Sequence, residues 1–261
     1  MARRFDRPAR SHPAPDDLIF GVNPVLEALA GRPDELSCVL GVAGARSAAP
    51  VIDAARRQGV AVELTDHATL ERLTHGGHHQ GVAARTRPFR YVAVEELLAR
   101  AAPLLVALDG ITDPQNLGAI IRSAEVLGAG GIILPKDRAA HVTATAIRAS
   151  AGAAIHLPAA QVVNLVRALE QAKQAGYWTV ALDEKGTQRF QDLPSLDRVL
   201  MLVGSEGRGS RRLVLEQADF RIAIPVRGRV GSLNAAGAAA IGLHELAQRV
   251  LSPTRAKDGG S

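Results

Sequence analysis

Short apolar runs alternate with amphipathic stretches along the second half of the chain, and this alternation predicts an α/β fold. Runs of strand length are separated by segments with helical periodicity. The expected strands span residues 104–108, 131–134, 178–182, 199–203 and 221–224. The expected helices span residues 116–127, 144–151, 162–175, 211–217 and 234–251. Strands that alternate with helices favour a largely parallel sheet.

Composition along the chain indicates two domains between terminal segments. Residues 1–17 are rich in Pro and Arg and lack a hydrophobic period, which predicts a disordered basic arm. Residues 18–88 mix helix-like and strand-like pieces and predict a small α/β domain, and residues 89–102 are a charged linker. The larger domain is expected at 103–251, followed by a disordered tail at 252–261.

The overall composition is that of a globular protein without a membrane segment. The chain has 261 residues, of which 47% are hydrophobic, and this is enough for two separate cores. No apolar stretch approaches the roughly 20 residues needed to cross a bilayer. The single cysteine, Cys38, excludes an intramolecular disulfide and a cysteine-based zinc site, so a cytoplasmic location is expected.

The charge balance is compatible with a polyanionic partner but does not identify one. Lys and Arg number 31 against 26 Asp and Glu, which gives a net charge of +5. A high content of Arg is suited to phosphate contacts, although a GC-rich genome also enriches Arg and Ala.

A glycine cluster at residues 128–131 raises the alternative of a dinucleotide-binding loop. Such a loop must follow a strand and open a helix, whereas this cluster ends an expected helix and precedes a strand. We therefore interpret Gly128 as part of a helix C-terminal cap.

Three segments each join an apolar strand to a polar turn, at the edge where open α/β sheets bind their ligands. They are LLVALDGITDPQNLGAIIRSAEV at 104–126, VLMLVGSEGRG at 199–209 and IPVRGRVGSLNAAGAAAI at 224–241. The polar side chains of interest in them are Asn116, Arg122, Glu206, Ser232 and Asn234.

Each segment alone has two interpretations. Arg122 is either a surface residue paired with Glu125 or a planar clamp for a phosphate, and Asn116 either stabilises a turn or orients a ribose hydroxyl. The glycines around Glu206 form either a flexible turn or a main-chain grip on a small ligand. Ser232 and Asn234 are ordinary N-caps, or they place a helix N-terminus against a polar ligand.

In this order, the three segments resemble motifs 1, 2 and 3 of the SpoU/TrmH family, the RNA ribose 2′-O-methyltransferases of the SPOUT class. The resemblance lies in Asn-Leu-Gly with Ala-Ile-Ile-Arg, in Gly-Ser-Glu-Gly-x-Gly, and in Ile-Pro-Val with Ser-Leu-Asn. The first domain is similar to the ribosomal-protein-like substrate-binding domain of the branch that methylates guanosine in 23S rRNA. Phe20-Gly21-Val22 and His79-Gln80-Gly81 carry that similarity.

This resemblance implies a trefoil-knotted, parallel-sheet C-terminal domain, S-adenosylmethionine as methyl donor, and a homodimer. It implies that Gly204, Ile224 and Leu233 surround the adenosine and that no metal takes part. The implied catalytic residue is Arg122, assisted by Asn116, Glu206, Ser232 and Asn234. One departure is Ala236, which stands where the family often has Ser.

The implied function is 2′-O-methylation of 23S rRNA in the cytoplasm, without a DNA or membrane partner. Two alternatives remain open. One is a 2′-O-methyltransferase for tRNA, or for rRNA as in antibiotic resistance. The other is a non-catalytic RNA-binding factor for ribosome assembly.

Three further groups of polar residues have open roles. His75, His78 and His79 lie in THGGHHQG, a segment that lacks carboxylate or Cys partners, and we interpret it as an RNA-facing loop rather than a metal site. Asp183 and Glu184 are either solvated or line the cofactor crevice. A phosphate-binding rim, which would make RNA binding steeply salt-dependent, is expected from the arginines Arg208, Arg211, Arg212, Arg227 and Arg229.

Overall fold

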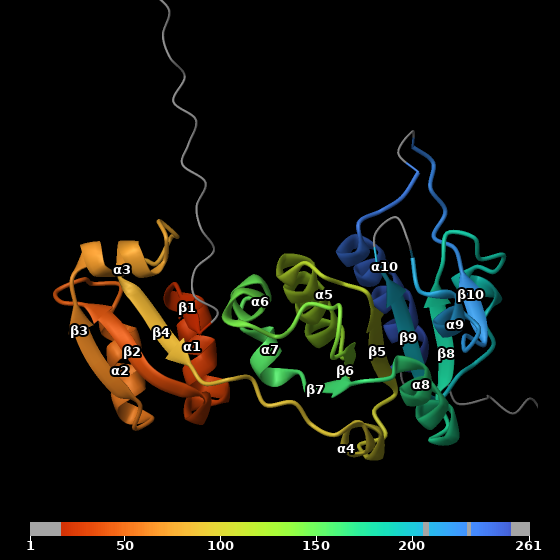
Figure 1. The fold of residues 1–261 in the computed structure, drawn as a ribbon, viewed down its shortest axis with the longest axis horizontal. Coiled ribbons are helices and arrows are strands. Elements are labelled where there is room, and N and C mark those ends of the chain that lie inside the picture. Colours follow the sequence, from red (N-terminus) through yellow and green to blue (C-terminus); the bar gives the residue numbers. More distant parts are fainter. Residues whose placement is uncertain (1–16, 206–208, 229–230, 252–261) are drawn as a thin grey trace, which may run out of the picture. The chain divides into compact units, whose positions relative to one another are not determined.

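The computed structural model describes residues 17–205, 209–228 and 231–251, which fall into two compact units (Figure 1). The first unit is assigned Met1–Pro88 and the second Phe89–Ser261. The expected N-terminal arm, except Asp17, and the expected C-terminal tail lie outside the described residues. Asp17 directly precedes the first strand, and its carbonyl accepts a 2.7 Å hydrogen bond from the amide of Thr86.

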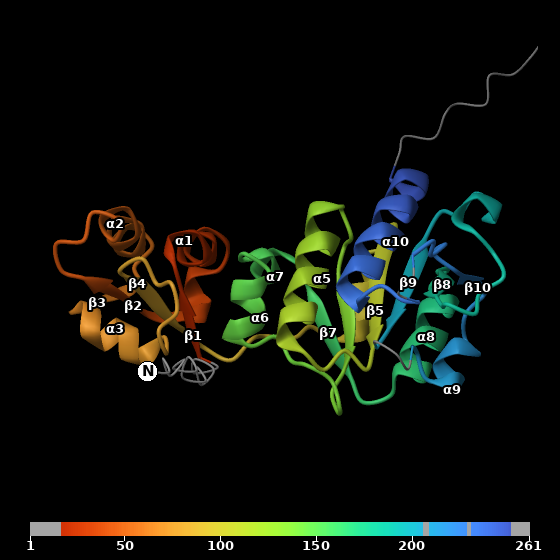
Figure 2. The same ribbon diagram turned by 90° about the horizontal axis from the view of Figure 1, so that it is seen from above.

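The first unit is a four-stranded mixed sheet with helices on both faces. The strand order is β1 (Leu18–Phe20), β4 (Val82–Thr86), β2 (Leu36–Val42) and β3 (Ala61–Thr65). Strand β4 is antiparallel to β1 and β2, and β3 is parallel to β2. Helices α1 (Val22–Gly31) and α2 (Ala49–Arg57) cover one face, and α3 (His67–Leu73) covers the other (Figure 2). A short 3-10 helix spans Pro33–Glu35.

The second unit is built on a six-stranded sheet in which every pair is parallel. Its strand order is β10 (Phe220–Ile222), β8 (Trp178–Leu182), β9 (Val199–Gly204), β5 (Leu104–Asp109), β6 (Ile132–Pro135) and β7 (Ala159–Val162). The predicted α/β class with a parallel sheet is thus confirmed. The knot stays a prediction, because strand order alone does not say whether a chain threads a loop.

Helices cover both faces of this sheet, which makes the second unit a three-layer structure (Figure 2). The helices are α4 (Val94–Ala99), α5 (Pro114–Val126), α6 (Ala144–Ala149), α7 (Ala153–His156), α8 (Leu165–Gln174), α9 (Arg212–Leu215) and α10 (Ala235–Val250), with a 3-10 turn at Phe190–Asp192. Leu97 of α4, Leu169 of α8 and Val214 of α9 share one buried cluster with Leu105. Helix α10 covers the opposite face, α5 packs beside it, and α6 and α7 pack against α5.

Most expected elements are present, with ends shifted by one or two residues, but two regions differ. Residues 89–102 contain α4, whose Val94, Leu97 and Leu98 are buried in the core, so this segment is more than a linker. The helix expected from residue 162 begins at Leu165, because Asn164 caps it by accepting a 3.2 Å hydrogen bond from the amide of Arg167. The small apolar residues before Asn164 form strand β7 on the edge of the sheet.

The glycine cluster ends α5 as expected. Gly128 has a φ of 81°, and its amide donates to the carbonyl of Glu125 at 3.0 Å. The amide of Ala129 donates to the carbonyl of Ala124 at 2.8 Å, which completes a Schellman cap. In the ranges that the structure describes, no helix has the length and apolar character needed to span a membrane.

Candidate functional site

A cavity of about 180 Å³ lies at the carboxyl ends of β8, β9 and β10. Parallel strands end at the same edge of a sheet, so the residues after Leu182, Gly204 and Ile222 meet there. The cavity is lined by Leu182, Asp183, Glu184, Lys185, Val203, Gly204, Ser205, Gly209, Ile222, Ile224, Val226, Ser232, Leu233, Ala235 and Ala238.

Four residues expected in the site line this cavity: Gly204, Ile224, Ser232 and Leu233. They come from segments 204–209 and 222–238, so the fold brings the second and third motifs together. Asn234 follows directly and caps α10, with its side-chain oxygen accepting a 2.7 Å hydrogen bond from the amide of Gly237. Glu206 lies outside the described residues.

The first motif contributes no lining residue within the described part of the chain. Helix α5 begins at its N-cap Asp113, which accepts a 3.0 Å hydrogen bond from the amide of Gln115. Asn116 in its first turn is partly buried, and Arg122, further along the same helix, is exposed. Helix α5 packs against α10, whose N-terminal residues line the cavity. Asn116 and Arg122 therefore lie in the same unit as the cavity, but they do not line it.

Gly204 sits where two stretches of main chain approach closely. A Cβ at this position would lie 2.2 Å from the amide nitrogen of Ser210 and 2.3 Å from the carbonyl carbon of Gly209. The loop is closed by paired main-chain hydrogen bonds of 3.2 and 2.8 Å between Ser205 and Gly209. Only glycine fits at residue 204. Because Gly204 and Gly209 have no side chains, their main-chain atoms line the cavity.

A buried carboxylate anchors the chain after this loop. Asp109, at the end of β5, is 1% exposed and lies opposite Gly204 in the parallel register. It accepts hydrogen bonds from the backbone amide of Arg211 at 2.7 Å and from the Nε of Arg211 at 2.8 Å. Sequence reasoning missed this residue, although an acid that ends a fully apolar strand was a usable signal.

The cavity wall combines apolar side chains with carboxylates. Asp183 and Glu184 line it, and the interpretation that they face a cofactor stays a prediction. Asp183 accepts hydrogen bonds from the side chain of Arg221 and a 3.1 Å bond from the amide of Lys185. Such a wall suits a ligand with an apolar ring system and hydroxyl groups.

The arginines of the expected phosphate rim are partly engaged. Arg211 pairs with Asp109, and Arg212 pairs with Glu216 at 3.0 Å. Arg227 is exposed, whereas Arg208 and Arg229 lie outside the described residues. The salt dependence expected from this rim stays a prediction.

The histidine segment belongs to a second cavity, of about 420 Å³, within the first unit. His78 and His79 line it together with His67 and Glu71 of α3. The expected absence of a carboxylate partner is wrong, because Glu71 lies 3.2 Å from the Nε2 of His79. The two residues are eight apart in sequence, and the turn after α3 brings them together.

Comparison with known proteins shows that the chain belongs to the SpoU rRNA methylase family. The family model of that description matches residues 103–244. A second family model, for RNA 2′-O ribose methyltransferase substrate binding, matches residues 18–92.

The relatives agree with this membership. An uncharacterized tRNA/rRNA methyltransferase of Mycobacterium ulcerans is 40% identical over 93% of this chain and 80% of its own length. The structure of the SpoU methyltransferase AviRb from Streptomyces viridochromogenes, in complex with the cofactor AdoMet, matches with a TM-score of 0.75 and 27% identity over 90% of this chain and 91% of that one. An AdoMet-bound rRNA methyltransferase from Sinorhizobium meliloti matches with a TM-score of 0.74 and 26% identity over 90% and 88%.

Proposed function

We propose that this chain transfers a methyl group from S-adenosylmethionine to the 2′-hydroxyl of a ribose in RNA. The observation that supports this most is the cavity lined by Gly204, Ile224 and Leu233, the three positions expected around the adenosine. The three residues come together at one edge of the sheet because of the fold, which is evidence separate from the sequence motifs.

The residues of the cavity fit this cofactor. Ile224 and Leu233 provide apolar surface for an adenine ring, and the carboxylates of Asp183 and Glu184 can accept hydrogen bonds from ribose hydroxyls. The volume of about 180 Å³ is below the range of about 300–1,000 Å³ for complete ligand sites, so we assign the adenosine part to it. When bound, S-adenosylmethionine supplies an electrophilic methyl group on a positively charged sulfur.

The protein has to assist attack by a ribose hydroxyl, which is a poor acid. A guanidinium in proteins keeps its proton, so we assign Arg122 the role of stabilising the negative charge that develops on the 2′-oxygen, while it also holds a phosphate. Asn116, Glu206, Ser232 and Asn234 position the ribose and Arg122. Holding the reacting groups in line can contribute about 7–11 kcal/mol in favourable cases.

The proposed substrate is a guanosine of 23S rRNA, reached in the cytoplasm. The match of residues 18–92 to a substrate-binding domain supports an RNA substrate. The resemblance of that domain to the 23S rRNA branch favours rRNA over tRNA.

We also propose a homodimer. Large apolar side chains are exposed on the adjacent helices α5 and α10 and directly after α10, where Val126 is 70%, Ile241 39% and Leu251 38% exposed. A second copy packed on this face would bury them, and sedimentation of the purified chain would detect it.

The first experiment incubates the purified chain with methyl-labelled S-adenosylmethionine and with unmodified 23S rRNA or tRNA, followed by digestion to nucleosides. Label in 2′-O-methylguanosine from 23S rRNA is expected. Label from tRNA alone would keep the reaction and replace the substrate, and binding without label would favour a non-catalytic assembly factor.

The same assay tests Arg122. Because lysine cannot reproduce the planar fork of donors, Arg122→Lys should lose most of the turnover. Retention of most activity would exclude a specific role for the guanidinium.

A further inference from the structure

The cavity of the first unit has the size of a site for a small planar group. Its volume of about 420 Å³ lies within the range of about 300–1,000 Å³ for small-molecule sites. Its lining comes from the residues after β2, from α3 and from the turn between α3 and β4.

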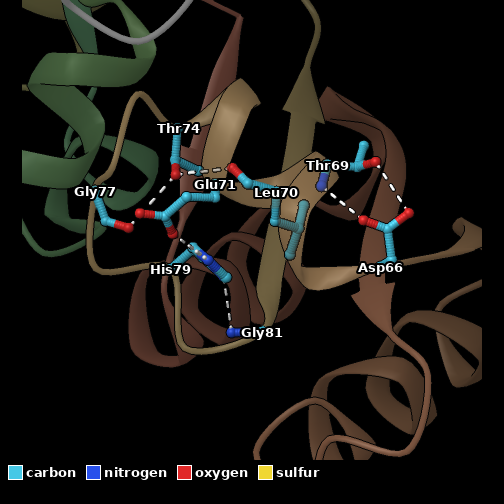
Figure 3. A network of polar contacts seen from close by, with 8 residues as sticks. All are labelled: Asp66, Thr69, Leu70, Glu71, Thr74, Gly77, His79 and Gly81. Atoms are coloured by element: carbon cyan, nitrogen blue, oxygen red, sulfur yellow. Dashed lines mark hydrogen bonds and ion pairs between the residues drawn. The ribbon is translucent and has the colours of Figure 1, made fainter. Parts of the chain in front are cut away.

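Hydrogen bonds stabilise the turn that closes this cavity (Figure 3). The hydroxyl of Thr74 donates to the carbonyl of Leu70 at 2.8 Å. A Cβ on Gly77 would lie 2.5 Å from the ring of Phe20, so the turn packs directly on the core. His79 is 3% exposed in this turn, and its orientation is therefore fixed by its surroundings.

The hydrogen bonds of His79 define its tautomer. Its Nδ1 accepts a 3.0 Å hydrogen bond from the amide of Gly81, so the proton of the neutral ring is on Nε2. Nε2 then donates to the Oε2 of Glu71 at 3.2 Å (Figure 3). The carboxylate of Glu71 is thereby held at the cavity while its side chain stays 52% exposed.

This tautomer argues against a metal ion. Ligand atoms of His67, Glu71 and His79 lie within 4.8 Å of one another, as a metal site would require. A metal ion would bind the unprotonated Nε2 of His79, so the proton of the neutral ring would have to be on Nδ1. There it would clash with the amide hydrogen of Gly81, which points at Nδ1. The geometry favours a ligand that donates hydrogen bonds to Glu71.

We propose that this cavity binds an unpaired guanine base of the RNA substrate, an inference that rests on the proposed action on RNA. Guanine presents two neighbouring donors, N1–H and the exocyclic N2 amine, which match the two oxygens of a carboxylate. Adenine and cytosine place a ring acceptor at the corresponding position, where it would face the negative charge of Glu71.

Two further residues complete the site. His67 is exposed, and its ring contacts the buried ring of His79 edge to face, with centroids 4.6 Å apart. It can stack on an unpaired base, as aromatic side chains do in RNA recognition. Arg46 is exposed between the lining residues Ala45 and Ser47, where it can contact the phosphate next to that base.

The test compares binding of the full chain to fluorescent single-stranded oligouridine RNAs that carry one central guanosine, inosine or adenosine. Inosine lacks the N2 amine, so it isolates one of the two hydrogen bonds. The guanosine RNA should bind on the order of 10-fold tighter than the inosine and adenosine RNAs. Glu71→Gln should remove this preference, so that the three RNAs bind the variant with similar affinity.

Glu63→Gln, at an exposed carboxylate of β3 away from the cavity lining, is the matched control and should keep the preference. Equal binding of the three RNAs, or a preference retained by Glu71→Gln, would refute the guanine site. So would stoichiometric Zn²⁺ binding that is lost in His67→Ala and Glu71→Gln.

Methyl transfer by the unmodified chain, measured in parallel, separates the two proposals. Transfer without a guanine preference would refute the cavity proposal alone. A guanine preference without transfer to any RNA would refute the proposed function and support the cavity.

Discussion

The pair formed by Asp109 and Arg211 should stabilise the second unit measurably, although the two residues are 102 positions apart. Asp109→Asn keeps one acceptor oxygen, so one of its two hydrogen bonds to Arg211 is lost. A hydrogen bond to a charged group contributes about 1.5–3 kcal/mol, and we expect a loss of unfolding free energy in that range. The loss should not be larger, because Arg211 is 57% exposed and remains hydrated.

The assay is urea unfolding followed by tryptophan fluorescence. Trp178 is the only tryptophan of the chain and begins β8 in the same unit, so it reports on the unfolding of that unit. Asp109 also lies opposite Gly204 at the cavity. The variant should therefore raise the KM for S-adenosylmethionine more than it lowers kcat.

Two further variants test the reasoning. Arg211→Ala removes the side-chain bond but keeps the backbone amide bond, so Asp109→Asn should cost less in that background than in the unmodified chain. Asp137→Asn, at an exposed position of the same unit, should change stability by less than about 0.5 kcal/mol. If Asp109→Asn behaved like this control, the assigned role of the buried carboxylate would be wrong.

Three other predictions concern packing, pH and capping. Gly118→Ala would place a Cβ 2.4 Å from that of Ala149 on α6, so it should cost about 1–3 kcal/mol in urea unfolding, and no loss would contradict the packing. Burial raises the pKa of Asp219, but hydrogen bonds from Lys173 and Thr179 outweigh it and lower that pKa below the usual value. Asp219 therefore stabilises the fold above the unfolded pKa of about 3.9, and the stability difference between the unmodified chain and Asp219→Asn should be constant above about pH 5 and shrink as the pH falls further. Asn234→Ala should cost about 0.5–2 kcal/mol through the lost N-cap, whereas Asn234→Asp should keep the stability and lose turnover if Asn234 also orients the ribose.

The elements and their ends were largely predictable because the signals for them are local. The helix cap at Gly128 and the helix start at Asp113 depend on residues within one turn. Apolar runs of strand length predicted five of the six strands of the parallel sheet. Strand β7 was missed because its small residues, Ala159 and Ala160, carry a weak strand signal and gain their burial only beside β6.

The candidate site was predictable in part. The positions of Gly204, Ile224, Ser232 and Leu233 followed from motifs at strand ends, and a parallel sheet brings such ends together whatever the rest of the chain does. That Asp183 and Glu184 also line the cavity was left open by the sequence. The separation of Asn116 and Arg122 from the cavity lining depends on how α5 packs beside α10, and no local pattern reports that packing.

The sequence by itself therefore determined the class of fold, most of its elements and the family, since hydrophobic periodicity, helix caps and motifs depend on neighbouring residues. Only the tertiary structure decided which distant polar groups meet. The anchor between Asp109 and Arg211 and the contact between Glu71 and His79 both arise when buried segments pack and their polar groups must find partners away from water. The packing of distant segments determines which polar groups become partners, and no local stretch of sequence specifies that packing.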